Sequence, residues 1–168
     1  SRPFHTTVYT TMLTATIRRF AHQRAAKVPP QQVPIIGVLG IGTTYNPKMP
    51  KLTYIFTSYL KWLECNNLRW MPISMYDDPL VVQEKLSKVN GILLTGGAED
   101  FGTKSKLTDY SRSVKTILDY AMETNDNGLL FPVFATCLGF ESMLVVLSDF
   151  EVPLDNIDND NFTLPITL

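Results

Sequence analysis

After residue 32 the chain alternates between two kinds of apolar segment, and this alternation most constrains its fold. The first kind is short, continuous and rich in branched residues, which is typical of strands buried on both faces of a sheet. Val33–Ile41 and Gly91–Thr95 have this character, and Arg69–Met75 and Phe131–Thr136 are also predicted as strands. Pro72 favours an edge position for Arg69–Met75, because proline cannot donate a ladder hydrogen bond.

The second kind carries apolar residues at helical spacing. Helices are predicted for Leu80–Val89, for a long segment after Ser105 whose buried face includes Tyr110 and Met122, and for Leu138–Leu147. An earlier helix is predicted from one apolar face: Leu52, Ile55, Phe56, Tyr59, Leu60 and Leu63. Strand and helix alternate about four times, which predicts an α/β domain built on a parallel sheet with helices on both faces.

Composition narrows the class of protein further. At 168 residues, 45% of them hydrophobic, the chain can form one domain with a substantial core. Its formal charge of -1 gives no general basis for nucleic-acid binding. No apolar run approaches the roughly 18 residues of a membrane span. Cys65 and Cys137 fit neither a disulfide framework nor a C-x-x-C motif, so we expect reduced thiols and no metal site.

The first 32 residues differ from the rest because they are basic and contain no Asp or Glu. A segment rich in arginine and threonine is typical of mitochondrial targeting, whereas a secretory signal needs an uninterrupted apolar stretch. A disordered or clamping N-terminal arm is the alternative interpretation. The expected organisation is therefore an arm at residues 1–32, an α/β domain at residues 33–168, and a mitochondrial location.

Two loops are expected to meet at one edge of the sheet. Ligands of such sheets bind beyond the carboxyl ends of the strands, and both Gly96–Gly97 and Cys137 follow a predicted strand. A cysteine in a strand-to-helix turn points out of the sheet, and the helix N-terminus after it favours a thiolate. The alternative is that Cys137 is an inert buried residue, which spacing alone favours.

Acyl transfer by such a cysteine needs hydrogen-bond donors for the developing oxyanion. The backbone N–H of Leu138 is one natural donor, and a glycine N–H of the Gly96–Gly97 loop is the other. Glycine suits that loop because the backbone must approach the substrate closely. Gly139 removes a side chain from the crowded first turn of the following helix.

Taken together, these segments resemble the γ-glutamyl hydrolases, a branch of the class I glutamine amidotransferase-like superfamily. The resemblance lies in PIIGVLG (Pro34 to Gly40), SYLKWLE (Ser58 to Glu64), VNGILLTGGAED (Val89 to Asp100) and FPVFATCLGFE (Phe131 to Glu141). They occur in the family's order and near its spacing. The resemblance implies a flavodoxin-like sheet, of which residues 33–168 would be a truncated part.

The resemblance also implies roles for individual residues. It makes Cys137 the nucleophile, with the backbone N–H groups of Leu138 and Gly97 as oxyanion donors. Three further residues match positions associated with substrate binding: Tyr59, Glu141 and Gly96. The implied reaction is hydrolysis of γ-glutamyl bonds, as in folylpoly-γ-glutamate, through a thioester and without a cofactor. A core-packing role remains the alternative for Tyr59, and a solvated or helix-capping carboxylate for Glu141.

The sequence departs from the family pattern at three points. Ala135 stands where glycine is usual before the cysteine, and Thr95 stands where proline is usual before the paired glycines. Cysteine hydrolases of this kind also use a histidine that comes late in the chain, and none follows Cys137. His5 and His22 both lie in the basic arm. We therefore expect a fragment of an active hydrolase or a natural short form.

Three interpretations of function follow. The first is a γ-glutamyl hydrolase acting on a γ-glutamyl peptide or small molecule. The second is a catalytically inactive hydrolase fold that serves as a structural or accessory subunit of a mitochondrial complex. The third is a related amidotransferase-like protein that senses or transfers rather than hydrolyses. A truncated sheet exposes an edge and an apolar face, so a protein partner or a second copy of the chain is expected to cover it. The family is typically vacuolar, lysosomal or secreted, and Asn161–Thr163 is a glycosylation sequon, so these locations are the alternative to the mitochondrion.

Overall fold

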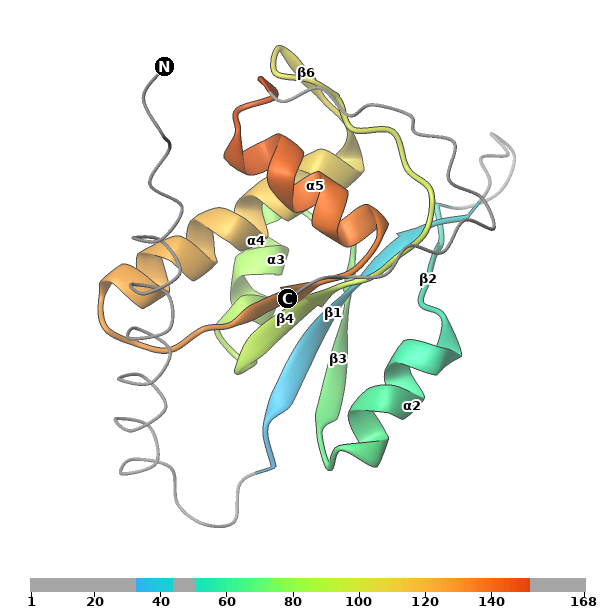
Figure 1. The fold of residues 1–168 in the computed structure, drawn as a ribbon, viewed down its shortest axis with the longest axis vertical. Coiled ribbons are helices and arrows are strands. Elements are labelled where there is room, and N and C mark those ends of the chain that lie inside the picture. The colour runs from blue at the N-terminus through green and yellow to red at the C-terminus, as the bar shows by residue number, and fades with distance from the viewer. Residues whose placement is uncertain (1–32, 44–50, 152–168) are drawn as a thin grey trace, which may run out of the picture.

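A computed structural model describes residues 33–43 and 51–151 (Figure 1). The basic arm with His5 and His22, its targeting interpretation, and the sequon at Asn161 lie outside the described residues. The helices and strands follow in this order: β1 (Ile35–Gly42), β2 (Thr53–Tyr54), α2 (Thr57–Cys65), β3 (Arg69–Ser74), α3 (Pro79–Leu86), β4 (Gly91–Leu94), β5 (Gly102–Thr103), β6 (Lys106–Leu107), α4 (Asp109–Asp126), β7 (Val133–Ala135) and α5 (Leu138–Leu147).

Four parallel strands in the order β3-β1-β4-β7 form the centre of the fold. Val38 of β1 is in register with Leu93 of β4, and Leu93 is in register with Phe134 of β7. The short β2 pairs antiparallel with the end of β1. Among the described strands β3 pairs only with β1, so the edge position that Pro72 indicated is confirmed.

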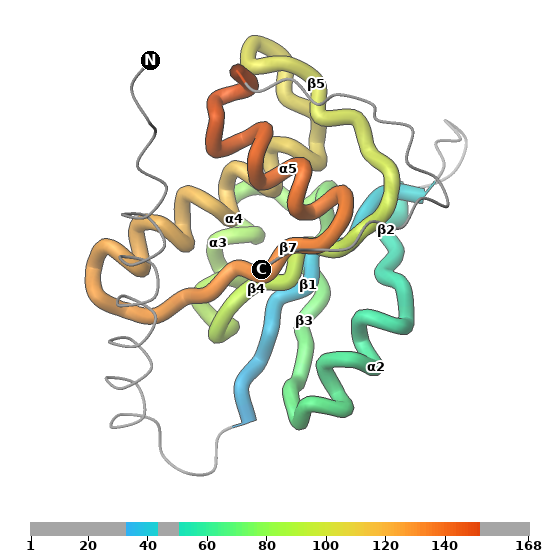
Figure 2. The backbone as a smooth tube through the Cα atoms, in the orientation of Figure 1, coloured from blue at the N-terminus to red at the C-terminus, as the bar shows by residue number. Residues whose placement is uncertain are grey.

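The strand order reverses next to β1. The chain runs from β1 outward to β3, and then returns to the other side of β1 for β4 and β7. This is the flavodoxin-like order, which confirms the expected fold class. In sheets of this order, ligands bind beyond the carboxyl ends of the strands where the order reverses, here β1 and β4. The segments that follow β4 and β7 both begin at this edge of the sheet (Figure 2).

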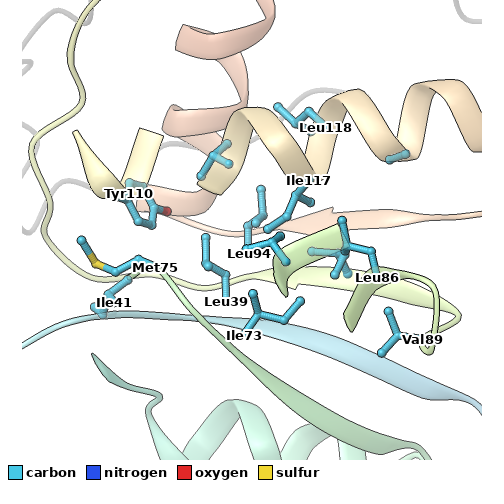
Figure 3. Close-up of a cluster of buried hydrophobic side chains, with 14 of the residues drawn as sticks. Leu39, Ile41, Ile73, Met75, Leu86, Val89, Leu94, Tyr110, Ile117 and Leu118 are labelled. Atoms are coloured by element: carbon cyan, nitrogen blue, oxygen red, sulfur yellow. The ribbon is translucent and has the colours of Figure 1, made fainter. Parts of the chain in front are cut away.

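Helices cover both faces of the sheet, as expected (Figure 1). On one face α3, α4 and α5 enclose the larger core, in which Leu39, Ile73 and Leu94 of the sheet meet Val114 and Ile117 of α4 (Figure 3). On the other face α2 is the one helix among the described residues. The smaller core there includes the buried residues Val38, Leu63 and Leu93.

The first predicted helix begins later than its apolar pattern indicated. Thr53 and Tyr54 pair with Gly42 and Ile41 as β2, so the backbone before Thr57 bonds to a strand and not within a helix. Leu52 and Phe56 are consequently 51% and 47% exposed. Met122, expected on the buried face of α4, is also exposed because it lies beyond the stripe that ends at Ala121.

Candidate active site

Cys137 occupies the turn between β7 and α5 in a strained backbone conformation. Its φ of 52° and ψ of −123° lie in a region that residues other than glycine rarely adopt. Such strain costs of order 1–3 kcal/mol and persists only where the surrounding structure imposes it. The side chain is exposed and does not pack into the core, so the interpretation of Cys137 as a buried core residue is wrong.

Hydrogen bonds hold this turn on both sides. Thr136 donates its N–H to Leu94 O at 3.1 Å, which fastens the end of β7 to β4. The N–H groups of Phe140 and Glu141 donate to Cys137 O at 2.9 and 3.0 Å. α5 therefore begins directly at the cysteine, and Cys137 stands at the N-terminal end of a ten-residue helix.

The loop after β4 lies against the cysteine. A Cβ atom on Gly96 would be 3.2 Å from Cys137 Cβ and 3.6 Å from its Sγ. Gly97 has a φ of 155°, and a Cβ there would collide with Ile41 Cδ1 and contact Leu138. Both positions thus require glycine, because a side chain would meet the neighbouring elements. Thr95, which replaces the family's usual proline, is buried and donates its hydroxyl to Leu39 O at 3.3 Å.

Two backbone N–H groups beside Cys137 have no acceptor among residues 33–43 and 51–151. They belong to Leu138, the first residue of α5, and to Gly97. The N–H of Gly96, by contrast, donates to the hydroxyl of Tyr59 at 3.0 Å. Free donors from two loops next to a strained cysteine are an arrangement that can stabilise the oxyanion of an acyl-transfer reaction.

The phenol of Tyr110 lies beneath this turn. It is 1% exposed, its hydroxyl is 3.4 Å from Ser142 Oγ, and Ser142 donates to Gly139 O at 2.8 Å. Burial raises the pKa of Tyr110, the hydrogen bond with Ser142 partly offsets this shift, and the nearby acidic groups of Glu99, Glu141 and Cys137 raise the pKa further. The neutral phenol therefore supports the first turn of α5 from below.

Glu99 closes the loop that follows the paired glycines. Its Oε1 accepts a hydrogen bond from Gly42 N at 2.6 Å, and burial raises the pKa of its carboxyl group. Sequence reasoning missed Glu99, Tyr110 and Ser142. A signal existed only for Glu99, which follows Gly96–Gly97 at the carboxyl end of a strand.

Most of the predicted site residues come together in the structure. Cys137, Leu138, Gly96, Gly97 and Tyr59 form one cluster around the turn. Glu141 lies in the first turn of α5 with an exposed side chain. Within the described part of the chain its carboxylate has no hydrogen bond or ion pair, and there is no histidine.

A polar cavity of about 280 Å³ lies farther along the same edge of the sheet, beyond β3. Asp109 in its wall accepts hydrogen bonds from Lys51 at 3.0 Å and from Arg112 at 2.9 Å. The contact with Lys51 is the main cause that lowers the pKa of Asp109. Burial raises the pKa of Tyr76, which also lines the cavity.

None of the described helices is long and apolar enough to span a bilayer.

The strand order and the turn at Cys137 define the class of protein: a flavodoxin-like α/β domain of the glutamine amidotransferase-like type. Comparison with known proteins gives the family, because the model of the family described as Peptidase C26 matches residues 34–148. The chain belongs to this family.

Curated relatives support this assignment. The chain is 39% identical to a gamma-glutamyl hydrolase of Mus musculus over 79% of its length and 40% of the relative's. It is 38% identical to Gamma-glutamyl hydrolase 1 of Arabidopsis thaliana over 65% of its length and 30% of the relative's. The chain is 31% identical to Gamma-glutamyl hydrolase B of Dictyostelium discoideum over 79% of its length and 38% of the relative's. The matched region spans less than half of each relative.

Proposed function

We propose that this chain carries the nucleophile of a cysteine hydrolase that cleaves γ-glutamyl bonds. One observation carries the proposal: the strained, exposed Cys137 stands beside the N–H groups of Leu138 and Gly97, which have no acceptor among the described residues and come from the start of α5 and the loop after β4. The names of the relatives support γ-glutamyl compounds as the class of substrate. Folylpoly-γ-glutamate is the substrate that we propose.

The reaction consists of acyl transfer to sulfur and then to water. The Cys137 thiolate attacks the γ-carbonyl carbon, a C–S bond forms, and the N–H groups of Leu138 and Gly97 bind the resulting oxyanion. The C–N bond then breaks, and the leaving amine takes the proton that the thiol gave to the base. Water cleaves the thioester, which releases a γ-carboxylate and restores the thiol.

The base and the substrate contacts complete this proposal. A cysteine hydrolase normally pairs its thiol with histidine. A histidine beyond residue 168 of a longer chain, His5 or His22 of the arm, or a histidine of another polypeptide would take the proton here. Glu141 lies one helical turn after Cys137, and its carboxylate has no ion pair within residues 33–43 and 51–151, so it suits the ammonium group of a γ-glutamyl substrate. Tyr59 and Gly96 form the wall of the site beside the cysteine.

Trapping the thioester tests the proposal. The full chain is mixed with a γ-glutamyl p-nitroanilide or a folylpoly-γ-glutamate, quenched in acid and analysed by intact mass spectrometry. We expect a glutamyl adduct on Cys137 and release of the amine, and neither with Cys137→Ala. An α-linked glutamyl substrate is the matched control. Absence of both adduct and release in the wild-type chain, under conditions where it is folded, would overturn the proposal.

An exposed apolar surface favours the accessory role as a second candidate. Phe140, Leu144 and Leu147 form a stripe on α5 that is 39–51% exposed. Phe134 of β7 is 56% exposed on the opposite face of the sheet, where its ring lies 5.5 Å from that of Trp62. β7 also pairs on one side only among the described strands. A surface of this kind is typical of a protein contact.

The partner that we propose for the apolar stripe on α5 is a protein chain with a complementary apolar face. It would belong to a mitochondrial assembly if residues 1–32 act as a targeting segment. Light scattering after gel filtration tests it with the full chain. We expect the wild type to elute as a dimer or larger species, and the double variant Phe140→Ser, Leu144→Ser to shift toward monomer. A monodisperse wild-type monomer with a cooperative thermal transition would contradict a partner-dependent fold.

A further inference from the structure

Two side chains hold the segment that carries Gly97. At its start, Tyr59 accepts a hydrogen bond from Gly96 N at 3.0 Å. At its end, Glu99 accepts a hydrogen bond from Gly42 N at 2.6 Å. The first contact fastens the segment to α2, and the second fastens it to the carboxyl end of β1. Gly97 lies between these two points.

Tyr59 reaches Gly96 because α2 is anchored to the sheet. Leu63, one turn after Tyr59, is 3% exposed and packs with Val38 and Leu93. The ring of Tyr59 packs against the same cluster. Its hydroxyl lies so close to the loop that a Cβ on Gly96 would be 2.8 Å from it. The position of the hydroxyl is therefore determined by the core and not by solvent.

This contact determines which amide is available to a substrate. Gly96 donates its N–H to the hydroxyl of Tyr59, whereas the N–H of Gly97 has no acceptor within the described ranges. A hydrogen bond at Gly96 also limits rotation of the peptide planes on either side of it. Oxyanion donors act through fixed geometry, and a displacement of about 1 Å can lower a rate roughly a hundredfold.

Glu99 limits the same loop from its other end. A Cβ on Gly42 would lie 2.9 Å from Glu99 Oε1 and 2.6 Å from the hydroxyl of Tyr76, so the carboxylate fits against bare backbone. Resting on the proposed hydrolysis, we propose that Tyr59 and Glu99 are positioning residues that hold the Gly97 N–H toward the reacting carbonyl group. Neither needs to touch the reacting atoms for this role.

Two reactions of Cys137 separate positioning from thiol reactivity. Alkylation by iodoacetamide develops no oxyanion, whereas acylation by γ-glutamyl p-nitroanilide does. For Tyr59→Phe we expect acylation to fall about tenfold to a hundredfold and alkylation to stay within about twofold. Tyr54→Phe, which removes a partly exposed hydroxyl just before α2, is the matched control and should change neither rate. Equal loss of both rates in Tyr59→Phe would overturn the positioning role.

The Glu99 variants test the second contact. Glu99→Gln keeps a carbonyl acceptor for Gly42 N, so we expect its acylation rate to stay within about threefold of wild type. Glu99→Ala loses the acceptor and should acylate at least about tenfold more slowly. Equal rates for the alanine and wild-type chains would contradict the role of Glu99.

Amide hydrogen exchange gives a readout that does not depend on activity. In Tyr59→Phe we expect the Gly96 amide, which loses its acceptor, to exchange at least about fivefold faster, while the amides of β4 keep their rates. Unchanged exchange at Gly96 would overturn the inference. If the wild-type chain is not acylated at all, the proposed function fails, and the exchange rates still decide whether Tyr59 holds the loop.

Discussion

The backbone of Gly139 lies directly against Leu94, because a Cβ on residue 139 would stand 2.6 Å from the carbonyl carbon of Leu94. This contact places the first turn of α5 on the carboxyl end of β4. It therefore brings Cys137 next to Gly96, the second residue after β4. The close approach of a helix and a strand, made possible by one glycine, creates the site.

Gly139→Ala should disrupt this approach. The added methyl group meets backbone atoms of Leu94 that cannot move aside, so we expect a loss of about 1–3 kcal/mol in the free energy of unfolding. Urea denaturation measures it. Gly128→Asn is the control, since Gly128 has a φ of 80° and open space around it, and asparagine tolerates that conformation. A Gly139→Ala chain as stable as wild type would show that α5 can shift.

Because the backbone at Cys137 is strained, we expect its glycine variant to be more stable than its alanine variant, which is the reverse of the usual order. Glycine adopts a φ of 52° and ψ of −123° more easily than alanine, so Cys137→Gly should be more stable than Cys137→Ala by about 1 kcal/mol. Cys65, at the end of α2, gives the control because glycine should be the less stable variant in a helix. The same order at both cysteines in thermal denaturation would argue against strain at residue 137.

Glu99 should make the protein less stable as the pH rises. Burial raises its carboxyl pKa in the folded state above the ordinary value of about 4.5. At pH values between about 4.5 and the raised pKa, the folded state therefore holds more protons than the unfolded state. Stability therefore falls as the pH rises through this window. Glu99→Gln removes the effect, so its stability relative to wild type should be higher at pH 7 than at pH 4. Urea titrations that give the same difference in the free energy of unfolding between Glu99→Gln and wild type at pH 4 and at pH 7 would refute this prediction.

Asp109 should show the opposite dependence. Lys51 and Arg112 lower its carboxyl pKa below 3.8, so its contribution is present above that value and is lost as the pH falls through the lowered pKa. Asp109→Asn should therefore be less stable than wild type at pH 7, and the deficit should shrink toward pH 3. We expect a small effect, because the pair is partly exposed and screened by salt. Added salt at pH 7 should reduce the deficit as well.

Asn125 fixes the start of β7 relative to α4. Its side-chain amide donates to Phe131 O at 2.9 Å and its Oδ1 accepts from Phe131 N at 2.9 Å. Asn125→Ala leaves both backbone groups without these partners, so we expect a loss of about 2 kcal/mol in urea denaturation. Asn127→Ala, at the exposed end of the same helix, should cost much less. Similar costs for the two variants would contradict this role.

The sequence predicted those parts of the fold that depend on local pattern. The helix Leu138–Leu147 begins and ends as expected, because strong apolar segments and a turn frame it. The helix start at Thr57 was missed, since pairing of Thr53 and Tyr54 with β1 overrides an apolar pattern that also fits a helix. Tyr110 was missed as a site residue because only the fold brings it under the turn at Cys137, and Glu99 was missed although it follows the paired glycines, because its contact with Gly42 depends on the sheet.

Selective labelling of Cys137 tests the central claim most directly. Both cysteines are exposed, so Cys65 is an internal control for simple accessibility. We expect a γ-glutamyl chloromethyl ketone to modify Cys137 with saturation kinetics and to leave Cys65 unmodified, as peptide mass spectrometry would show. An excess of a γ-glutamyl peptide should slow the modification. Equal, non-saturating labelling of Cys137 and Cys65 would contradict a built γ-glutamyl site at the turn.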